Sequence, residues 1–430
     1  MLVSAGSRPY ERGWRLALLL LWLPAVYFVT LGPTPPAEGE PALEGFAFCL
    51  LCGERGGADL LLNVAFFVPL GLVSGRRLGL PGAFFLGAAM AAAIELLQLA
   101  VPGRYSTLAD VLSNGAGSLL GAALYRGLAY LARGAALPPS VGATLAAGVG
   151  CFVLVGGWLL APAPTPKPYW GQWTPELGGA RYGGTVLEAR FDGRPFPRTR
   201  FPPDSDPARA LRSDWALSGT VIKGPPPGQV VSVLSISDGD GEEILYLGAY
   251  QEHLLLRERL RAQEWRLHRP ELVAPDALAT AGAGDTLDVS ARRAGADRCL
   301  AVNGAEVCGL AFTPGRLWSL LTYSTGASRW MQRVADAALI VLLFLPLGVC
   351  APSWRAAGAN GLVAAALMAA AVAWTRLVPD FLVESVAALG GLALGVAAAA
   401  TLRHWGAPGR RDEPLSPATE PSAPASHGSA

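Results

Sequence analysis

The chain has 430 residues, of which 52% are hydrophobic and only 16% are charged, and its formal net charge is +1. The near balance of Lys+Arg 34 with Asp+Glu 33 gives no basic excess of the kind that nucleic-acid binding needs. Several apolar runs reach the ~18–20 residues that cross the hydrocarbon core of a bilayer, so the sequence predicts a polytopic α-helical membrane protein.

The apolar runs and the residues that punctuate them predict about eight spans. The first follows Arg8, Arg12 and Arg15 and has no convincing small-residue cleavage site, so we interpret it as an uncleaved signal anchor. The predicted spans lie near 14–31, 58–75, 82–101, 107–126, 141–161, 334–351, 359–377 and 380–402.

Arginine residues are distributed unevenly between the two sides of these spans. The richer side is expected to be cytoplasmic, because positively charged loops are retained there. This orientation places both termini in the cytoplasm and leaves residues 162–330 on the other side of the membrane. The arginines on the cytoplasmic side are Arg8, Arg12, Arg15, Arg76, Arg77, Arg126, Arg133, Arg355, Arg403, Arg410 and Arg411.

Residues 162–330 differ from the rest in pattern. Alternating segments such as "ALSGTVI", "QVVSVLSIS" and "EILYLGAY" are separated by turn residues, which predicts an inserted all-β sandwich. The expected organisation is an N-terminal membrane domain of about five spans (1–161), the sandwich (162–330) and C-terminal membrane spans (331–405). The Pro-, Ser- and Ala-rich tail (406–430) is expected to be disordered in the cytoplasm.

The segment "CLAVNGAEVC" (299–308) predicts a β-hairpin, because Asn-Gly is a preferred two-residue turn. Counting back from that turn places Cys299 opposite Cys308, and opposed cysteines outside the cytoplasm favour a disulfide over free thiols. Cys49 and Cys52 could also oxidise, whereas Cys151 and Cys350 fall within predicted spans.

An internal repeat relates the two membrane segments. "NVAFFVPLGLV" (63–73) resembles "IVLLFLPLGVC" (340–350), and Val101-Pro102 matches Val378-Pro379 at the same offset. After a three-residue deletion, Gly117 and Gly121 match Gly391 and Gly395. A degenerate duplication explains the shared offset. Most polar residues of the first half have no polar partner in the second, although Asp110 is matched by Glu384.

Polar residues of the first half are predicted to meet at the outer ends of three spans. Glu95 and Gln98 share one helix face, and Asp110 and Asn114 share another, because three- and four-residue spacings are neighbours on a helix. Ionisable residues inside a membrane are costly, so a functional site is the first hypothesis, with interhelical packing as the alternative. The candidate binding residues are Asn63, Glu95, Gln98, Arg104, Asp110 and Asn114.

These motifs, "NVAFFVPLG", "ELLQ", Arg104 and "ADVLSNGAGSLLG", resemble those of the VanZ-like membrane proteins over about 60–125. Members of that family are associated with low-level glycopeptide (teicoplanin) resistance, so the resemblance implies a bacterial cell-envelope protein. The β region is similar in pattern to laminin-G/concanavalin-A-like sandwiches. The chain departs from a minimal VanZ-like protein by this inserted domain and by the additional spans.

The sequence therefore predicts an envelope protein that binds an amphiphilic or lipid-linked headgroup at the outer leaflet. Its partners are expected to be a membrane lipid or lipid-linked precursor and an outer glycan or protein, with no nucleic acid. A membrane hydrolase or transferase using Glu95 and Asp110, or a transporter, is the alternative. No cofactor or metal is expected, and "SDGDGEE" (237–243) is interpreted as an acidic turn rather than a calcium loop.

Overall fold

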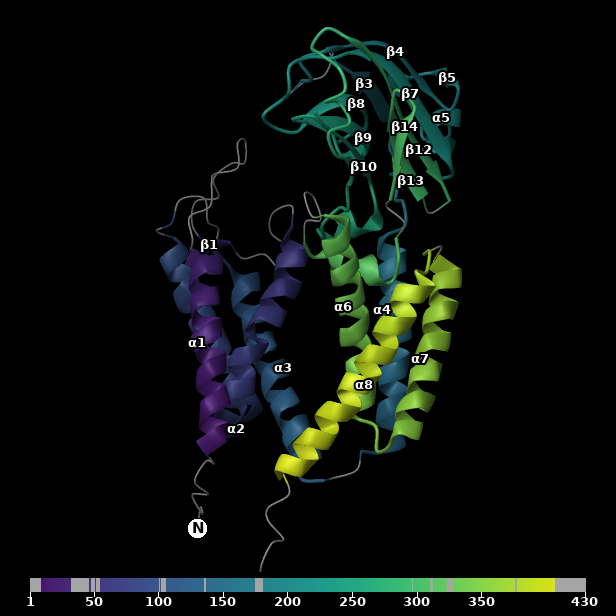
Figure 1. The fold of residues 1–430 in the computed structure, drawn as a ribbon. Coiled ribbons are helices and arrows are strands. Elements are labelled where there is room, and N and C mark those ends of the chain that lie inside the picture. The colour runs from purple at the N-terminus through teal and green to yellow at the C-terminus, as the bar shows by residue number, and fades with distance from the viewer. Residues whose placement is uncertain are drawn as a thin grey trace, which may run out of the picture.

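The computed structural model describes residues 9–31, 46–47, 51, 55–99, 101, 106–134, 137–174, 181–295, 297–309, 312–322, 328–375 and 377–406. Its helices form two bundles that stand side by side, and a β domain lies over one end of the second bundle (Figure 1). We call this end of the helices the sandwich end. The N-terminal end of α1 and the C-terminal end of α8 lie at the opposite end (Figure 1).

The first bundle contains α1 (Pro9–Leu31), α2 (Gly56–Gln98) and α3 (Leu108–Ala132). α2 reverses direction at Gly79, where φ is 70° and ψ is −170°. Glycine suits this position because a positive φ is strained for residues that carry a Cβ. Gly71 and Gly87, from the two arms of α2, both lie against Ser118 of α3. The two spans predicted near 58–75 and 82–101 are thus the arms of one helical hairpin.

The second bundle contains α4 (Pro139–Leu159), α6 (Arg329–Val349), α7 (Trp354–Thr375) and α8 (Phe381–Gly406). A core of buried side chains joins α4, α6, α7 and α8, and Phe344 and Leu347 are fully enclosed within it. The sequence repeat relates these two residues to Phe67 and Leu70, which are buried in the first bundle against Trp22 and Val26 of α1.

The two bundles repeat the same close approach of helix backbones. In each, glycines of the last helix lie directly against backbone carbonyl groups of an earlier helix, where a Cβ would be 2.0–2.6 Å from the oxygen. The contacts pair Gly117 with Val64 and Gly121 with Val68 in the first bundle, and Gly391 with Val341 and Gly395 with Leu345 in the second. These positions correspond by the offsets of the sequence repeat, so the packing repeats together with the sequence.

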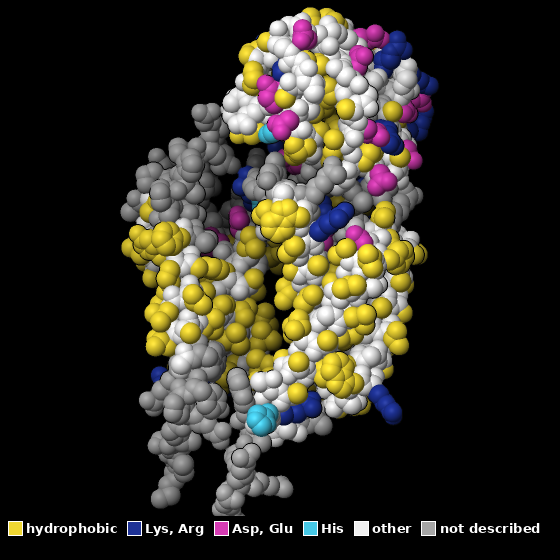
Figure 2. Space-filling model, viewed as in Figure 1, with side chains coloured by type: hydrophobic (Ala, Val, Ile, Leu, Met, Phe, Trp, Pro, Cys, Tyr) yellow, Lys and Arg dark blue, Asp and Glu magenta, His cyan; other side chains and the backbone are white. Residues whose placement is uncertain are grey.

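Five helices in the described part of the chain are long and apolar enough to cross a membrane. They are α2, α4 and α7, together with Trp330–Val349 of α6 and Phe381–His404 of α8. α1 contains a shorter apolar stretch, Arg15–Phe28. Hydrophobic side chains cover the visible faces of both bundles, whereas acidic and basic side chains gather on the β domain (Figure 2). The structure therefore supports a helical membrane protein, and the number of eight spans stays a prediction.

The β domain contains two six-stranded sheets in which all pairings are antiparallel. The first sheet has the order β11 (Leu272–Ala274), β10 (His253–Glu258), β9 (Glu243–Tyr250), β8 (Val231–Asp238), β3 (Tyr169–Trp173) and β6 (Arg200–Phe201). The second has the order β14 (Ala305–Cys308), β13 (Asp297–Val302), β12 (Thr286–Ala294), β7 (Trp215–Ile222), β4 (Thr185–Phe191) and β5 (Arg194–Pro195).

Two local predictions for this domain can be compared with its strands. Cys299 pairs with Cys308 across β13 and β14, in the register expected from the Asn303-Gly304 turn, and the two sulfurs are bonded. The acidic stretch 237–243 forms the turn between β8 and β9, where an Asp238 carboxylate oxygen accepts hydrogen bonds from two backbone N–H groups of the turn. Cys49 and Cys52 and the tail after Gly406 lie outside the described residues.

Two short 3-10 helices at the base of the sandwich reach the sandwich ends of both bundles. After η1 (Arg261–Trp265), the carbonyl of Arg266 accepts hydrogen bonds from the backbone N–H groups of Gly57 and Ala58 at the start of α2. These are N–H groups that have no partner within the helix itself. η2 (Gly315–Leu320) precedes α6 in the chain, and its Gly315 lies against Asp336 of that helix. The sandwich is therefore tied to both bundles.

We expect Gly121→Ala to destabilise the protein, because a Cβ at this position would lie 2.0 Å from the Val68 carbonyl oxygen. Relieving the clash requires α2 and α3 to separate, and overpacking of this kind costs about 1–3 kcal/mol. Gly127→Ala is the matched control on the same helix, since nothing lies within 4 Å of a Cβ there. Thermal unfolding of the detergent-solubilised variants measures the difference, and equal midpoints would contradict the packing.

We expect Cys299 and Cys308 to be oxidised in the mature protein, because a sandwich outside the cytoplasm is in a compartment where disulfides persist. Peptide mapping after alkylation without reductant should recover the two cysteines as one linked pair. Cys151 and Cys350, which are free in the structure, provide the internal control for alkylation. Complete alkylation of Cys299 and Cys308 would argue against both the bond and the outer location.

Candidate functional site

The predicted polar residues gather at the sandwich end of the first bundle. Asn63 lies near the start of α2, Glu95 lies near its end, and Asp110 lies in the first turn of α3. Because α2 folds back at Gly79, its two ends are neighbours, and α3 begins beside them. Glu95 is only 4% exposed, although it carries a carboxylate. We call Asn63, Glu95, Thr107 and Asp110 the polar cluster.

Asp110 is held by two side chains from different segments. Its Oδ1 atom accepts a hydrogen bond from the side-chain amide of Asn63, and its Oδ2 atom accepts one from the Thr107 hydroxyl at 2.7 Å. The backbone N–H of Asp110 donates in return to Thr107 Oγ1 at 3.1 Å. Thr107 is thus the N-cap of α3, and a threonine followed three residues later by an acid is typical of helix starts.

Glu95 is bound by the segment that precedes α3. The backbone N–H of Thr107 donates to Glu95 Oε2 at 2.9 Å, and the Ser106 hydroxyl donates to the backbone carbonyl of Glu95 at 2.7 Å. Ser106 and Thr107 form β2, which pairs in parallel with β1 (Phe46–Ala47) from the loop after α1. The cluster therefore joins α2, α3 and this loop.

Two of the six predicted residues lie apart from the cluster. Gln98 donates from Nε2 to the backbone carbonyl of Thr30 at 2.7 Å, so it connects α2 to α1. Asn114 is 6% exposed and lies one turn further along α3, and its side-chain oxygen has no hydrogen-bond partner. Arg104, predicted to cap the turn between the helices, lies outside the described residues.

Sequence reasoning did not include Ser106, Thr107 and Ser118 among the candidate residues. The signal for Thr107 was present in "TLAD" (107–110), which has the spacing of a helix-capping motif. Ser118 is completely buried, and its hydroxyl oxygen has no hydrogen-bond partner. It lies one turn beyond Asn114. Two unpartnered polar atoms therefore lie on successive turns of α3 after Asp110.

The second bundle has buried carboxylates at the positions that correspond to Asp59 and Asp110 of the first. Another segment of the same chain, η2, donates hydrogen bonds to both of them. Glu384, the counterpart of Asp110, accepts a hydrogen bond from the backbone N–H of Gly315 at 3.1 Å. Asp336, the counterpart of Asp59, accepts hydrogen bonds from the Arg316 guanidinium at 2.9 Å and from Trp318 Nε1 at 2.6 Å. All three donors belong to η2.

A grouping of potential metal ligands in the described part of the chain comprises Cys299, Glu306 and Cys308. Both sulfurs are bonded to each other, so neither is available as a thiolate ligand. The carboxylates of the polar cluster accept hydrogen bonds from amide, hydroxyl and backbone donors. This arrangement can accept further donors from a ligand.

We expect Asn63 and Asp110 to be energetically coupled. A double-mutant cycle with Asn63→Ala and Asp110→Ala should give an interaction energy of about 1 kcal/mol, as for interhelical hydrogen bonds in other membrane proteins. A second cycle with Asn63→Ala and Gly127→Ala serves as the control, because nothing lies within 4 Å of a Cβ at position 127. Chemical or thermal unfolding in detergent measures the cycle, and strict additivity would contradict the coupling.

The comparisons with known proteins bear on the first bundle. Residues 20–131 match the family model described as VanZ/LLP1, and this range contains the second half of α1, both arms of α2 and nearly all of α3. No curated protein and no solved structure matches the chain, so the likeness of the sandwich to laminin-G and concanavalin-A domains stays a prediction. The chain is thus a helical membrane protein with a VanZ-type domain at residues 20–131 and a separate all-β domain.

Proposed function

We propose that this protein is a bacterial cell-envelope membrane protein whose first bundle binds the polar headgroup of an amphiphilic or lipid-linked molecule at the outer leaflet. The observation that carries the proposal is the difference between the two bundles. The acids of the second bundle are bonded to η2, whereas the first bundle has buried polar atoms without partners next to its acids. A headgroup with hydrogen-bond donors would find acceptors at the sandwich end of the first bundle.

Two buried polar atoms beside the polar cluster support a ligand there. An unpartnered buried polar atom costs about 1–3 kcal/mol, so a ligand that supplied the missing partner would gain affinity. Asn114 Oδ1 and Ser118 Oγ are two such atoms on successive turns of α3, directly below Asp110. Donor groups of a ligand that reached this depth would offset their cost.

Charge placement supports the outer location. The turn of α2 carries Arg76 and Arg77, the end of α3 carries Arg126, and Arg355 and Arg403 lie at the ends of α7 and α8. All of these positions are opposite the sandwich (Figure 1). By the retention of positive charge in the cytoplasm, the sandwich and the polar cluster are then on the outer side of the inner membrane.

We also propose that the sandwich is a binding module for an extracytoplasmic glycan or protein. The face of β4, β7 and β12 has a shallow hollow of about 260 Å³. Polar side chains line it, including Glu188, Ser218, Thr220 and Asp288. Hydroxyl and carboxylate groups on an open sheet face can exchange hydrogen bonds with sugars or with a protein surface.

Native mass spectrometry of the detergent-purified protein tests the headgroup site. The wild type is expected to retain a bound amphiphile, and Glu95→Gln should retain it about tenfold less, because one carboxyl oxygen is replaced by an amide nitrogen while the acceptor for Thr107 is kept. Glu384→Gln is the matched control, since it removes a buried carboxylate at the position already occupied by Gly315.

Comparable retention in all three proteins would contradict a ligand role for Glu95. Absence of any adduct from the wild type, together with reduced thermal stability of Glu95→Gln, would instead assign the cluster to helix packing. Thermal unfolding of each purified sample is therefore measured beside the spectra.

A further inference from the structure

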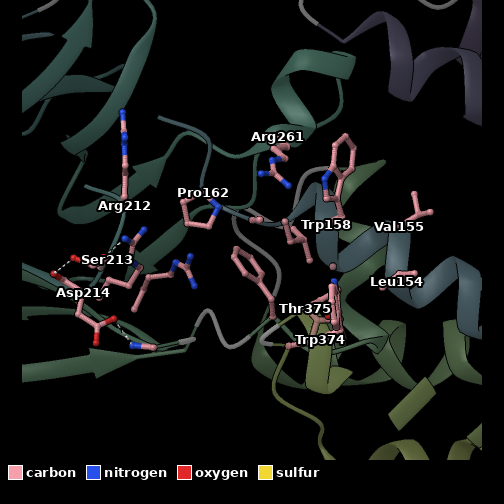
Figure 3. A pocket seen from close by; sticks show the side chains of 18 residues that line it. Leu154, Val155, Trp158, Pro162, Arg212, Ser213, Asp214, Arg261, Trp374 and Thr375 are labelled. Atoms are coloured by element: carbon pink, nitrogen blue, oxygen red, sulfur yellow. Dashed lines mark hydrogen bonds between the residues drawn. The ribbon is translucent and has the colours of Figure 1, made fainter. Parts of the chain in front are cut away.

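A cavity of about 530 Å³ lies between the base of the sandwich and the sandwich ends of α4 and α7 (Figure 3). It is separate from the polar cluster, since no residue of that cluster lines it. Its size falls in the range of about 300–1,000 Å³ that is usual for small-molecule sites.

The membrane side of the cavity is apolar. Leu154, Val155 and Trp158 come from the last turns of α4, and Trp374 comes from the last turn of α7. Trp158 and Trp374 are 43% and 82% exposed. Tryptophan is enriched where a helix meets the boundary between hydrocarbon and headgroups, so the cavity opens at that level.

The sandwich side of the cavity is basic. Arg212, Arg261, Arg293 and Arg298 all line it. Arg261 extends toward Trp158, with its guanidinium carbon 5.1 Å from the ring centroid, whereas Arg212 points away from the helices (Figure 3). Arg293 and Arg298 are each 4% exposed, which is unusual for a side chain that is always charged.

The carboxylates that accompany these arginines are fewer. Arg293 and Arg298 share the single carboxylate of Glu258, at 3.0 Å from Arg298 Nη2. Asp214, which also lines the cavity, accepts a hydrogen bond from the backbone N–H of Gly295. Burial lowers the pKa of Arg293, and the neighbouring Arg298 lowers it further, against the opposing effect of Glu258. Arg293 also donates to the backbone carbonyls of Leu211 and Ser213, so Arg293 and Arg298 are held within the sandwich, and Arg261 is the arginine that faces the membrane side of the cavity.

We propose that this cavity binds an anionic phospholipid, with the phosphate against Arg261 of the sandwich and an acyl chain along α4 and α7. Guanidinium groups bind phosphate oxygens through short, charge-assisted hydrogen bonds, which suits arginine more than lysine. The apolar lining from α4 and α7 continues into the hydrophobic surface of the helices, which a lipid chain covers but a soluble anion does not. A bound lipid anion supplies a negative charge beside Arg261, for which the described residues provide no carboxylate partner.

The cavity and the polar cluster have no residue in common. The lipid site therefore shares with the proposed function only the outer placement of the sandwich. The delipidated full-length protein is titrated in detergent with dioleoyl phosphatidylglycerol and, separately, with the zwitterionic dioleoyl phosphatidylcholine. Native mass spectrometry should show one phosphatidylglycerol held at least tenfold more tightly than phosphatidylcholine. Arg261→Gln should weaken the phosphatidylglycerol adduct about tenfold, the loss expected for one charge-assisted hydrogen bond.

Arg292→Gln is the matched control, because this exposed arginine precedes Arg293 on β12 and pairs with Glu306 outside the cavity. It should bind phosphatidylglycerol like the wild type. Equal affinity of the wild type for the two lipids would overturn the proposal without reference to any variant. Displacement of the lipid by equimolar glycerol 3-phosphate would also overturn it, by assigning the cavity to a soluble anion.

Discussion

The close contact between glycine and backbone carbonyl in each bundle is the constraint on which the rest of the structure depends. In lipid, apolar side chains gain little by leaving one hydrocarbon environment for another, so helix association relies on close packing. Gly117 and Gly121 bring α3 against the first arm of α2, and Gly71 and Gly87 bring both arms of the hairpin to one level of α3. Only at this separation can short side chains such as those of Asn63, Thr107 and Asp110 reach one another.

Carboxylates buried at the helix ends need donors, and the two bundles supply them differently. The first bundle uses Asn63, Thr107 and the backbone of the segment before α3, so its donors come from within its own helices and loops. The second has lost these side chains, since Ile340 stands where Asn63 does. Its acids are instead bonded to η2, the segment that leads from the sandwich into α6. The same helix packing is thus present in both bundles. Only in the second are the buried acids bonded to the segment that connects the sandwich with α6.

Features that depend on a regular spacing of residues were predictable from the sequence. Contacts between residues that are far apart in the chain were not. Apolar length predicted the helices, alternation predicted the sheets, and the Asn303-Gly304 turn predicted the register of its hairpin. By contrast, spacing placed Gln98 beside Glu95 on one helix face, but α1 offers Gln98 a carbonyl at Thr30, and no periodicity in the sequence shows that partner. The arginine-lined cavity was missed for the same reason, because Arg212, Arg261 and Arg298 are far apart along the chain and meet only through the sheet order.

The position of the sandwich in the chain explains how it can affect both bundles. It lies between α4 and α6, the place that residues 32–55 occupy between α1 and α2 in the first half. In each half this connection reaches the local acids, through β1 beside Thr107 in the first and through η2 at Glu384 in the second. The sandwich additionally holds the start of α2 through the carbonyl of Arg266. Because η1 contains Arg261 of the cavity and ends at the residue before Arg266, a lipid bound against Arg261 would act on the same short segment that caps α2 at Gly57 and Ala58.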